Sequence, residues 1–187
     1  MKKIMFYDGY GLTKAVLEGR KTMTRRIIRN ELLSETLAYI RRNINYDWDD
    51  DKIDAECDQY ILYHSPYKLN EVVAVAQAYK DTCWTSPVLR LKDEPGWGNK
   101  MFVYAGLMPH QIRITNVRIE KLQDISDENC IKEGVQQQLI DIFTFDGWRF
   151  FTHTARDAFA ALIDKVSGKG TWDRNPYVFV YEFELVK

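Results

Sequence analysis

The spacing of large side chains near the end of the sequence is the feature that most constrains the fold. Between residues 177 and 185, aromatic or leucine side chains alternate with smaller or charged ones: Tyr177, Phe179, Tyr181, Phe183 and Leu185. A period of two is that of a β-strand with one face toward a core. We therefore predict a closing strand whose aromatic face is buried. Stacking of nucleobases on these rings is the alternative.

Residues 111–120 and 71–76 also have strand patterns. In the longer segment, the apolar residues before and after Thr115-Asn116 fall on opposite parities, and one extra residue would return them to one face. We predict a β-bulge at that point. The shorter segment is apolar and rich in β-branched residues, as in a buried strand.

Four segments have helical periodicity with recognisable ends. Gly19, Gly134 and Gly168 follow three of them, where a left-handed residue can terminate a helix. Ser126 and Thr154 provide hydroxyl caps at the starts of two. The predicted helices span residues 12–18, 31–42, 127–133 and 155–166.

Strands with a few peripheral helices predict an α+β domain built on a small, mostly antiparallel sheet or β-barrel. Of the 187 residues, 45% are hydrophobic, which is enough for one packed core. The chain is too short to predict two independent cores. We expect a single domain over residues 1–187 with insertions at about 30–60 and 80–110. The second insertion is rich in proline and glycine and is predicted to be irregular.

The net charge of −1 hides two opposed segments. Residues 14–42 hold eight basic and three acidic side chains, a local charge of +5, whereas residues 47–58 hold seven acidic and one basic, a local charge of −6. The neutral total excludes a generic polyanion binder but permits a small basic cleft. We predict that the acidic run is a solvated insertion, since it lacks the glycine and terminal glutamate of a calcium loop.

Cysteine usage and hydropathy indicate a cytoplasmic protein. Cys57, Cys83 and Cys130 are odd in number and widely spaced, which favours reduced, mostly buried thiols. We expect no secretory signal at the start and no membrane span, because no apolar run approaches about 20 residues.

The three histidines have no metal-ligand spacing and no phosphate loop occurs, so no metal or cofactor is predicted. We take a monomer as the default state.

Residues 19–26 form the segment with the most side chains able to bind a ligand. Basic and hydroxyl side chains crowd this segment directly after a predicted helix end, and each can bind a phosphate or carbonyl group. A solvated basic face is the equally weighted alternative. Lys21 and Thr24 would converge only if the chain turns before entering a strand, and Gly19 offers that turn. The candidate nucleic-acid-binding residues are Arg20, Lys21, Thr22, Thr24, Arg25 and Arg26.

Gly19, Lys21 and Arg26 fit the motif Gly-x-Lys-x-x-x-x-Arg, and the segment resembles that of the ASCH domain family, relatives of the PUA barrel, in its phage and prophage form. Three more blocks resemble the family in the same order: residues 65–73, 117–126 and 172–183. The resemblance implies a PUA-like β-barrel with flanking helices and a cleft that binds RNA or a modified nucleoside.

One branch of that family hydrolyses N4-acetylcytidine with a Lys, a Thr and a Glu. The resemblance transfers these roles to Lys21, Thr24 and Glu133. Thr24 would attack the acetyl carbonyl after giving its proton to a neutral Lys21, and Glu133 would orient the pair or protonate the leaving amine. Lys21 would need a lowered pKa, for which burial and neighbouring arginines are the expected causes.

The sequence also departs from the family. The compact hydrolases are much shorter, and Ala76 and Gln77 stand where phage-type members commonly have an Arg-Glu pair. The leading hypothesis is therefore a domain that binds RNA or a modified nucleoside, with Trp84 or Trp97 stacking on a base. The alternatives are the amidohydrolase and a protein-interaction module whose basic cleft is incidental.

Overall fold

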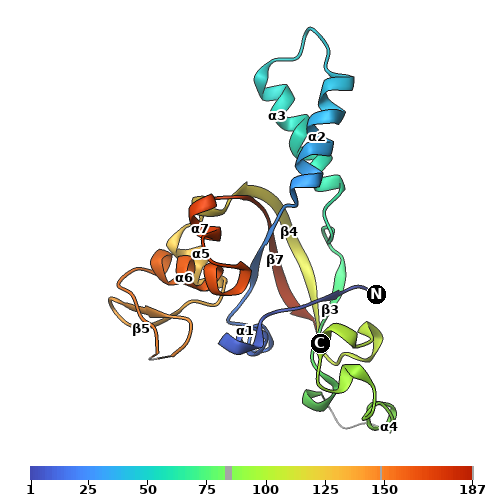
Figure 1. Cartoon of the computed structure of the whole chain (residues 1–187), viewed down its shortest axis with the longest axis vertical. Helices are drawn as coiled ribbons and strands as arrows, with labels where there is room; N and C mark the ends of the chain where they lie inside the picture. The colour runs from blue at the N-terminus through green and yellow to red at the C-terminus, as the bar shows by residue number, and fades with distance from the viewer. Residues whose placement is uncertain (83–85, 148, 187) are drawn as a thin grey trace.

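A five-stranded sheet organises the protein, with strand order β1-β3-β4-β7-β2 (Figure 1). The structure, a computed structural model, describes residues 1–82, 86–147 and 149–186, so that Cys83 and Trp84 lie outside the described residues. The β1–β3 pair is parallel and the other pairs are antiparallel. The strands are β1 (Lys3–Ile4), β2 (Met23–Ile27), β3 (Val72–Val75), β4 (Gln111–Lys121) and β7 (Tyr177–Val186).

The predicted α+β class and mostly antiparallel sheet are confirmed. Because β1 and β2 stand at opposite ends of the order and do not pair in the described part of the chain, the sheet is not plainly a closed barrel. The predicted β-bulge is confirmed by a register shift between Ile114 and Asn116 where β4 pairs with β7. The strand predicted at 71–76 corresponds to β3.

The closing strand is buried on both faces over its middle, where one buried face was predicted. Phe179, Tyr181 and Phe183 are buried as expected, but Val178 and Val180 on the opposite face are also 0% exposed. The physical reason is position, since β7 lies between β4 and β2 rather than at an edge. The stripe is shorter than predicted, because its outer residues Tyr177 and Leu185 are each 42% exposed.

The helices begin and end largely where their capping residues predict. The Ser126 and Thr154 hydroxyls accept backbone N–H groups three residues later, at 3.3 and 3.0 Å. Gly19, Gly134 and Gly168 have positive φ angles after three of the helices. The helices are α1 (Leu12–Leu17), α2 (Asn30–Asn43), α3 (Asp50–Tyr63), α4 (Ser86–Leu89), α5 (Asp127–Lys132), α6 (Ala155–Ser167) and α7 (Thr171–Arg174).

The acidic run is solvated, as predicted, and most of it is helical. It forms most of α3, which Asp49 caps through the Lys52 N–H at 2.8 Å. Together, α2 and α3 form a helical hairpin that projects away from the sheet (Figure 1). Carboxylates suit a helix N-terminus, so Asp50 and Asp51 in the first turn favour the start of α3.

Residues 80–110 contain short helical turns around a second small core, rather than an entirely irregular connection. Tyr79, Val88, Val103 and Met108 are buried there. A hairpin of β5 (Gln136–Leu139) and β6 (Ile142–Thr144) follows α5 and was not predicted, because its glutamines give no alternation. The 3₁₀ turns are Asp8–Tyr10, Tyr79–Asp81, Pro95–Trp97, Lys100–Phe102, Ala105–Leu107 and Leu122–Asp124.

Among the described residues, no helix is both long and apolar enough to cross a membrane. Cys57 and Cys130 are free thiols. Cys130 is fully buried, as predicted, and burial raises the pKa of its thiol to about 12.

Candidate functional site

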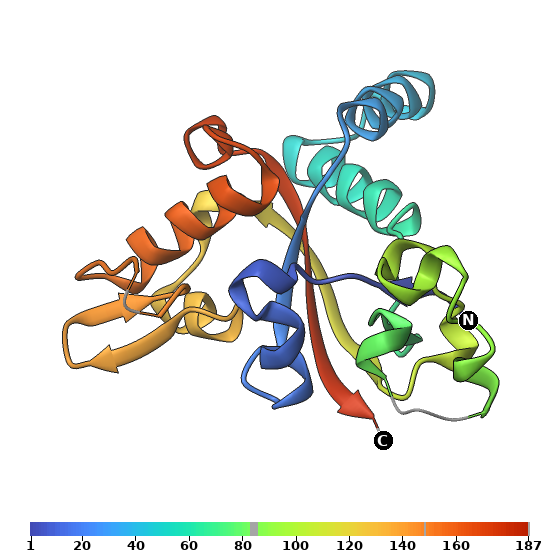
Figure 2. The ribbon, with the colours of Figure 1, turned by 60° about the horizontal axis from the view of Figure 1, so that its bottom comes forward.

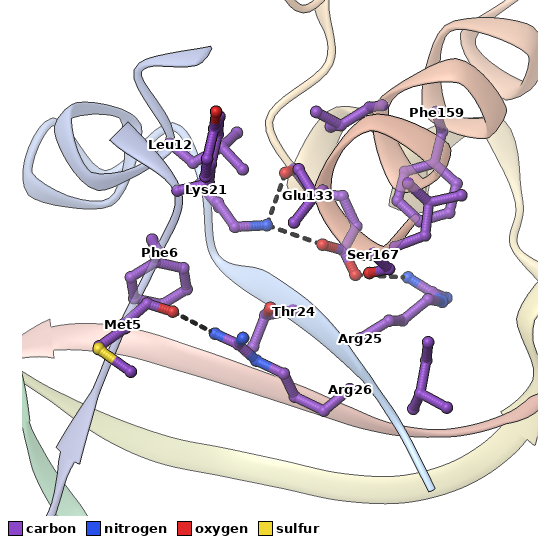
Figure 3. A pocket seen from close by; sticks show the side chains of 15 residues that line it. Met5, Phe6, Leu12, Lys21, Thr24, Arg25, Arg26, Glu133, Phe159 and Ser167 are labelled. Atoms are coloured by element: carbon purple, nitrogen blue, oxygen red, sulfur yellow. Dashed lines mark hydrogen bonds and ion pairs between the residues drawn. The ribbon is translucent and has the colours of Figure 1, made fainter. Parts of the chain in front are cut away.

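A pocket of about 290 Å³ lies across the free edge of β2 (Figure 3). It is bounded by the segment that follows β1, by the end of α5 and by α6, elements that surround β2 in Figure 2. Its charged and hydroxyl-bearing lining residues are Lys21, Thr24, Arg25, Arg26, Glu133, Ser167 and Tyr7.

The chain turns before β2, as the convergence of Lys21 and Thr24 requires. Gly19 adopts a left-handed φ of 71° after α1, and the Thr22 N–H donates to the Lys132 carbonyl at 3.0 Å. This contact ties the segment to the end of α5. Lys21 is thereby directed toward Glu133, and its side chain is 3% exposed.

Lys21 and Glu133 form a buried ion pair. The Lys21 Nζ donates to the Glu133 carboxylate at 2.7 Å and to the Glu133 backbone carbonyl at 2.5 Å. Burial lowers the pKa of Lys21, the Glu133 charge opposes this shift, and the charges of Arg26 and Arg25 reinforce it. The hydrolase hypothesis requires a shift in this direction, and burial is its main cause.

Arg25 forms the second contact with Glu133. Its Nη1 lies 3.1 Å from Glu133 Oε1, and its Nε donates to Glu120 Oε1 at 2.9 Å. The Arg25 side chain is fully buried, with its guanidinium 5.9 Å from the centre of the Phe159 ring on α6. Charges that apolar surroundings enclose this tightly need partners on every side, and Arg25 has them.

Arg26 lies on the opposite face of β2, with Thr24. Its Nη2 donates to the Met5 carbonyl at 2.5 Å, and its guanidinium lies 5.6 Å from the centre of the Phe6 ring. Burial lowers the pKa of Arg26. In the described part of the protein, its buried Nε has no hydrogen-bond partner. A polar atom left in this state is a reason to look for a ligand.

Thr24 is buried, with 5% of its surface exposed, and it lines the same pocket. Figure 3 shows Thr24 between Lys21 and Arg26, facing the pocket. Its hydroxyl makes no hydrogen bond with any described residue, so it is free to bind or attack a ligand. The structure thus brings together the three residues predicted for hydrolysis.

Two of the six predicted nucleic-acid-binding residues do not line this pocket. Arg20 points to the surface, where its Nη2 lies 2.6 Å from Glu18 Oε2, and it borders a separate hollow beside β5. Thr22 contributes its backbone to the turn instead. Both residues precede β2, which begins at Met23, and neither lines the pocket.

The aromatic rings at the pocket are not those predicted. Phe6, Tyr7 and Phe159 line it, whereas Trp97 packs against the second small core. Sequence reasoning also missed Glu120, although its parity with Arg118 on a predicted strand placed both side chains on one face. Nothing in the sequence indicated that Arg25 would reach across to that strand.

Ala76 and Gln77 follow β3 and do not line the pocket, so the missing Arg-Glu pair removes none of its residues. Within the described ranges, no three His, Cys, Asp or Glu side chains form a cluster that could hold a metal ion. No family model, curated protein or solved structure matches this chain. The relationship to the ASCH family therefore stays a prediction that rests on the sequence motifs.

Proposed function

We propose that this pocket is the active site of an amidohydrolase that takes one N-acylated nucleoside, with N4-acetylcytidine as the test substrate. The observation that carries the proposal is the 2.7 Å contact between buried Lys21 and Glu133 beside the unbonded Thr24 hydroxyl. Burying an ion pair is costly compared with apolar packing. Perturbed ionisable groups in a pocket are typical of functional sites.

The size and charge of the pocket favour a single nucleoside over an extended RNA. A volume of about 290 Å³ is at the small end of ligand sites. Its cations are turned inward and engaged by the Glu133 carboxylate, the Glu120 carboxylate and the Met5 carbonyl. They therefore offer little to a phosphate backbone lying on the surface.

The residues can be assigned to a two-step acyl transfer. A neutral Lys21 accepts the Thr24 hydroxyl proton as Thr24 Oγ1 bonds to the acyl carbon. The Lys21 ammonium then returns this proton to the departing exocyclic nitrogen of the substrate. Glu133 holds the Lys21 amine in place during this transfer. Water hydrolyses the resulting Thr24 ester with Lys21 as base, which frees the acid and restores the hydroxyl.

The lowered pKa of Lys21 supports this assignment. A lysine at its ordinary pKa would almost never be neutral near pH 7, and burial increases the neutral fraction. The rate should therefore rise with pH as Lys21 loses its proton.

The test is to incubate the protein with N4-acetylcytidine and measure released cytidine. Lys21→Ala should abolish release, whereas Arg20→Ala, outside the pocket, should not change it. Turnover that survives Lys21→Ala would contradict the mechanism, and no turnover by the unmodified protein would contradict the hydrolase.

Binding without hydrolysis is the second candidate, and the unpartnered Arg26 Nε favours it. In that case, Lys21 and Arg26 hold the ligand, RNA or nucleoside, and Thr24 hydrogen-bonds its base or sugar. Arg26→Ala should then weaken binding to single-stranded RNA and reduce the slope of affinity against salt by about one. An unchanged slope would mean that Arg26 makes no phosphate contact.

The proposal includes an ASCH-type, PUA-like fold in a cytoplasmic, phage-type protein. The contact of Arg26 with the Met5 carbonyl supports this fold, because it draws edge strand β2 toward the chain that leaves β1. The free thiols of Cys57 and Cys130 support the cytoplasmic location.

A further inference from the structure

Ion pairs continue from the pocket along one face of the sheet. We call this set the ion-pair row: Lys21, Glu133, Arg25, Glu120, Arg118 and Glu182. Cations and carboxylates alternate along it. The Arg118 Nε lies 3.2 Å from Glu120 Oε2, and the Arg118 Nη1 donates to Glu182 Oε1. The row starts at a side chain that is 3% exposed and ends at one that is 35% exposed.

The row crosses the sheet because β7 has small side chains on this face. Arg25 of β2 and Arg118 of β4 both stand opposite Val180, and Glu120 stands opposite Val178. Directly opposed residues share a face, so Arg25 passes over these valines to reach Glu120. The aromatic residues of β7 occupy the other face, where they would not obstruct it.

Glu120 is the only carboxylate besides Glu133 that contacts Arg25 in the described part of the chain. Two Arg25 nitrogens, Nε and Nη2, bond to Glu120 Oε1, and Nη1 is left for Glu133. The fork of the guanidinium is thus fixed by Glu120, which determines where Nη1 meets the Glu133 carboxylate.

We infer that Glu120 is a positioning residue of the proposed active site, acting through Arg25 to hold Glu133 against Lys21 and to favour the protonated form of Lys21 in the resting protein. This inference rests on the proposed function for its catalytic meaning. The effect of the Glu120 charge on the protonation of Lys21 does not depend on the proposed function. A negative charge near an amine favours its protonated form, so loss of the Glu120 charge must make Lys21 release its proton at lower pH.

Other titratable groups on β2, α5 and α6 do not replace Glu120. Arg25 and Arg26 on β2 both disfavour the Lys21 ammonium. Cys130 on α5 is a neutral thiol near pH 7, since burial raises its pKa to about 12. Arg156 on α6 donates to the backbone carbonyls of Gln123 and Ile125. Glu133 is therefore the carboxylate that contacts Lys21 directly, and Glu120 is the second carboxylate, joined to Glu133 through Arg25.

The experiment compares Glu120→Gln with Glu184→Gln, a matched change on β7 whose carboxylate pairs with Arg113 outside the row. Side-chain ¹⁵N NMR of Lys21 gives its pKa without any need for activity. We expect Glu120→Gln to lower this pKa by about one pH unit, an interaction of the size expected between partly buried charges. Glu184→Gln should leave it unchanged.

The pH dependence of cytidine release gives the catalytic readout. The rising limb of the rate should move to lower pH by the same amount in Glu120→Gln, with a lower maximal rate because Glu133 is held less well. Glu120→Asp keeps the charge but retracts the carboxylate, so it should retain the Lys21 pKa and lose maximal rate. A variant that lowered the rate only by impairing folding would not move the limb.

Failure of the inference about Glu120 and failure of the proposed function give different results. An unchanged Lys21 pKa in folded Glu120→Gln, or an equal shift in Glu184→Gln, overturns the inference whether or not the protein is an enzyme. If Glu120→Gln does not fold, the inference is decided by Glu120→Asp, in which a maximal rate equal to that of the unmodified protein overturns it. A shifted Lys21 pKa without turnover by any form overturns the proposed function and supports the charge effect.

Discussion

The Lys21 pocket and the α2–α3 hairpin both concentrate charge, but they place it in opposite surroundings. In the pocket, Lys21, Arg25 and Glu133 are nearly inaccessible and each contacts an opposite charge. On the hairpin, most carboxylates of residues 47–58 face solvent, and α3 buries only Ile61 among its described residues. The contrast shows that burial, rather than charge density, determines what a charged residue contributes.

The largest expected effect separates a buried carboxylate from an exposed one. Glu133→Ala leaves Lys21 and Arg25 buried without their shared partner and should lower the free energy of unfolding by about 3–5 kcal/mol. Asp47→Ala on the exposed turn of the hairpin should change it by less than about 0.5 kcal/mol. Urea unfolding of both variants measures the difference. Similar values for the two would mean that the pocket charges are not effectively buried.

The glycine beside Glu133 gives the next largest effect. Gly134 has a φ of 109°, and a Cβ there would lie 2.9 Å from a Leu12 methyl carbon and 3.6 Å from the Lys21 side chain. Gly134→Ala should therefore cost about 1–3 kcal/mol. Gly98→Ala is the control, because φ is −109° and no atom lies within 4 Å of its Cβ position. Equal stability of the two variants would contradict the close packing at the end of α5.

Removing a helix cap should affect global stability in one region and only local stability in the other. Thr154→Ala removes the cap of α6, which packs on the main core, and should lower the global free energy of unfolding by about 1 kcal/mol. Asp49→Ala removes the cap of α3 and should speed amide exchange in α3 with little change in global stability. Hydrogen exchange and urea unfolding separate the outcomes. A global loss with Asp49→Ala would show that the hairpin unfolds with the core.

The smallest effect concerns Asp58 on the hairpin. Burial, assisted by the Asp54 charge, raises the pKa of Asp58, so its ionised form is disfavoured in the folded state. Stability from this group therefore increases as pH falls through the folded-state pKa. Asp58→Asn should stabilise the protein at pH 7 by less than about 0.5 kcal/mol, because the side chain is mostly exposed. The gain should shrink toward pH 4 in thermal melts, and a gain that grew on acidification would contradict it.

The sequence was informative where the signal was local. Caps at Ser126 and Thr154, the glycines that end helices, and the parity change at the β-bulge each depend on residues a few positions apart. They predicted the element boundaries well. The acidic run is solvated as predicted, but its helix was not predicted, because solvated charge is compatible with both a loop and a helix.

The sequence predicted which residues form the candidate site, but it did not predict how they are arranged. The motif at residues 19–26 indicated Lys21 and Thr24, and a family resemblance supplied Glu133. Sequence could not show that Arg20 faces outward, or that Arg25 reaches Glu120 across β7. The contact between Arg25 and Glu120 joins residues 95 positions apart, and it depends on strand order, which only the folded chain establishes.

The most direct test of the central claim is the rate of cytidine release from N4-acetylcytidine by Thr24→Val and Thr22→Val. These variants make the same change two residues apart, and only Thr24 lines the pocket. We predict that Thr24→Val lowers kcat/KM on the order of a thousandfold while Thr22→Val stays near the unmodified protein. Equal rates in the two variants, or no release by the unmodified protein, would contradict the account of this pocket as a hydrolytic site.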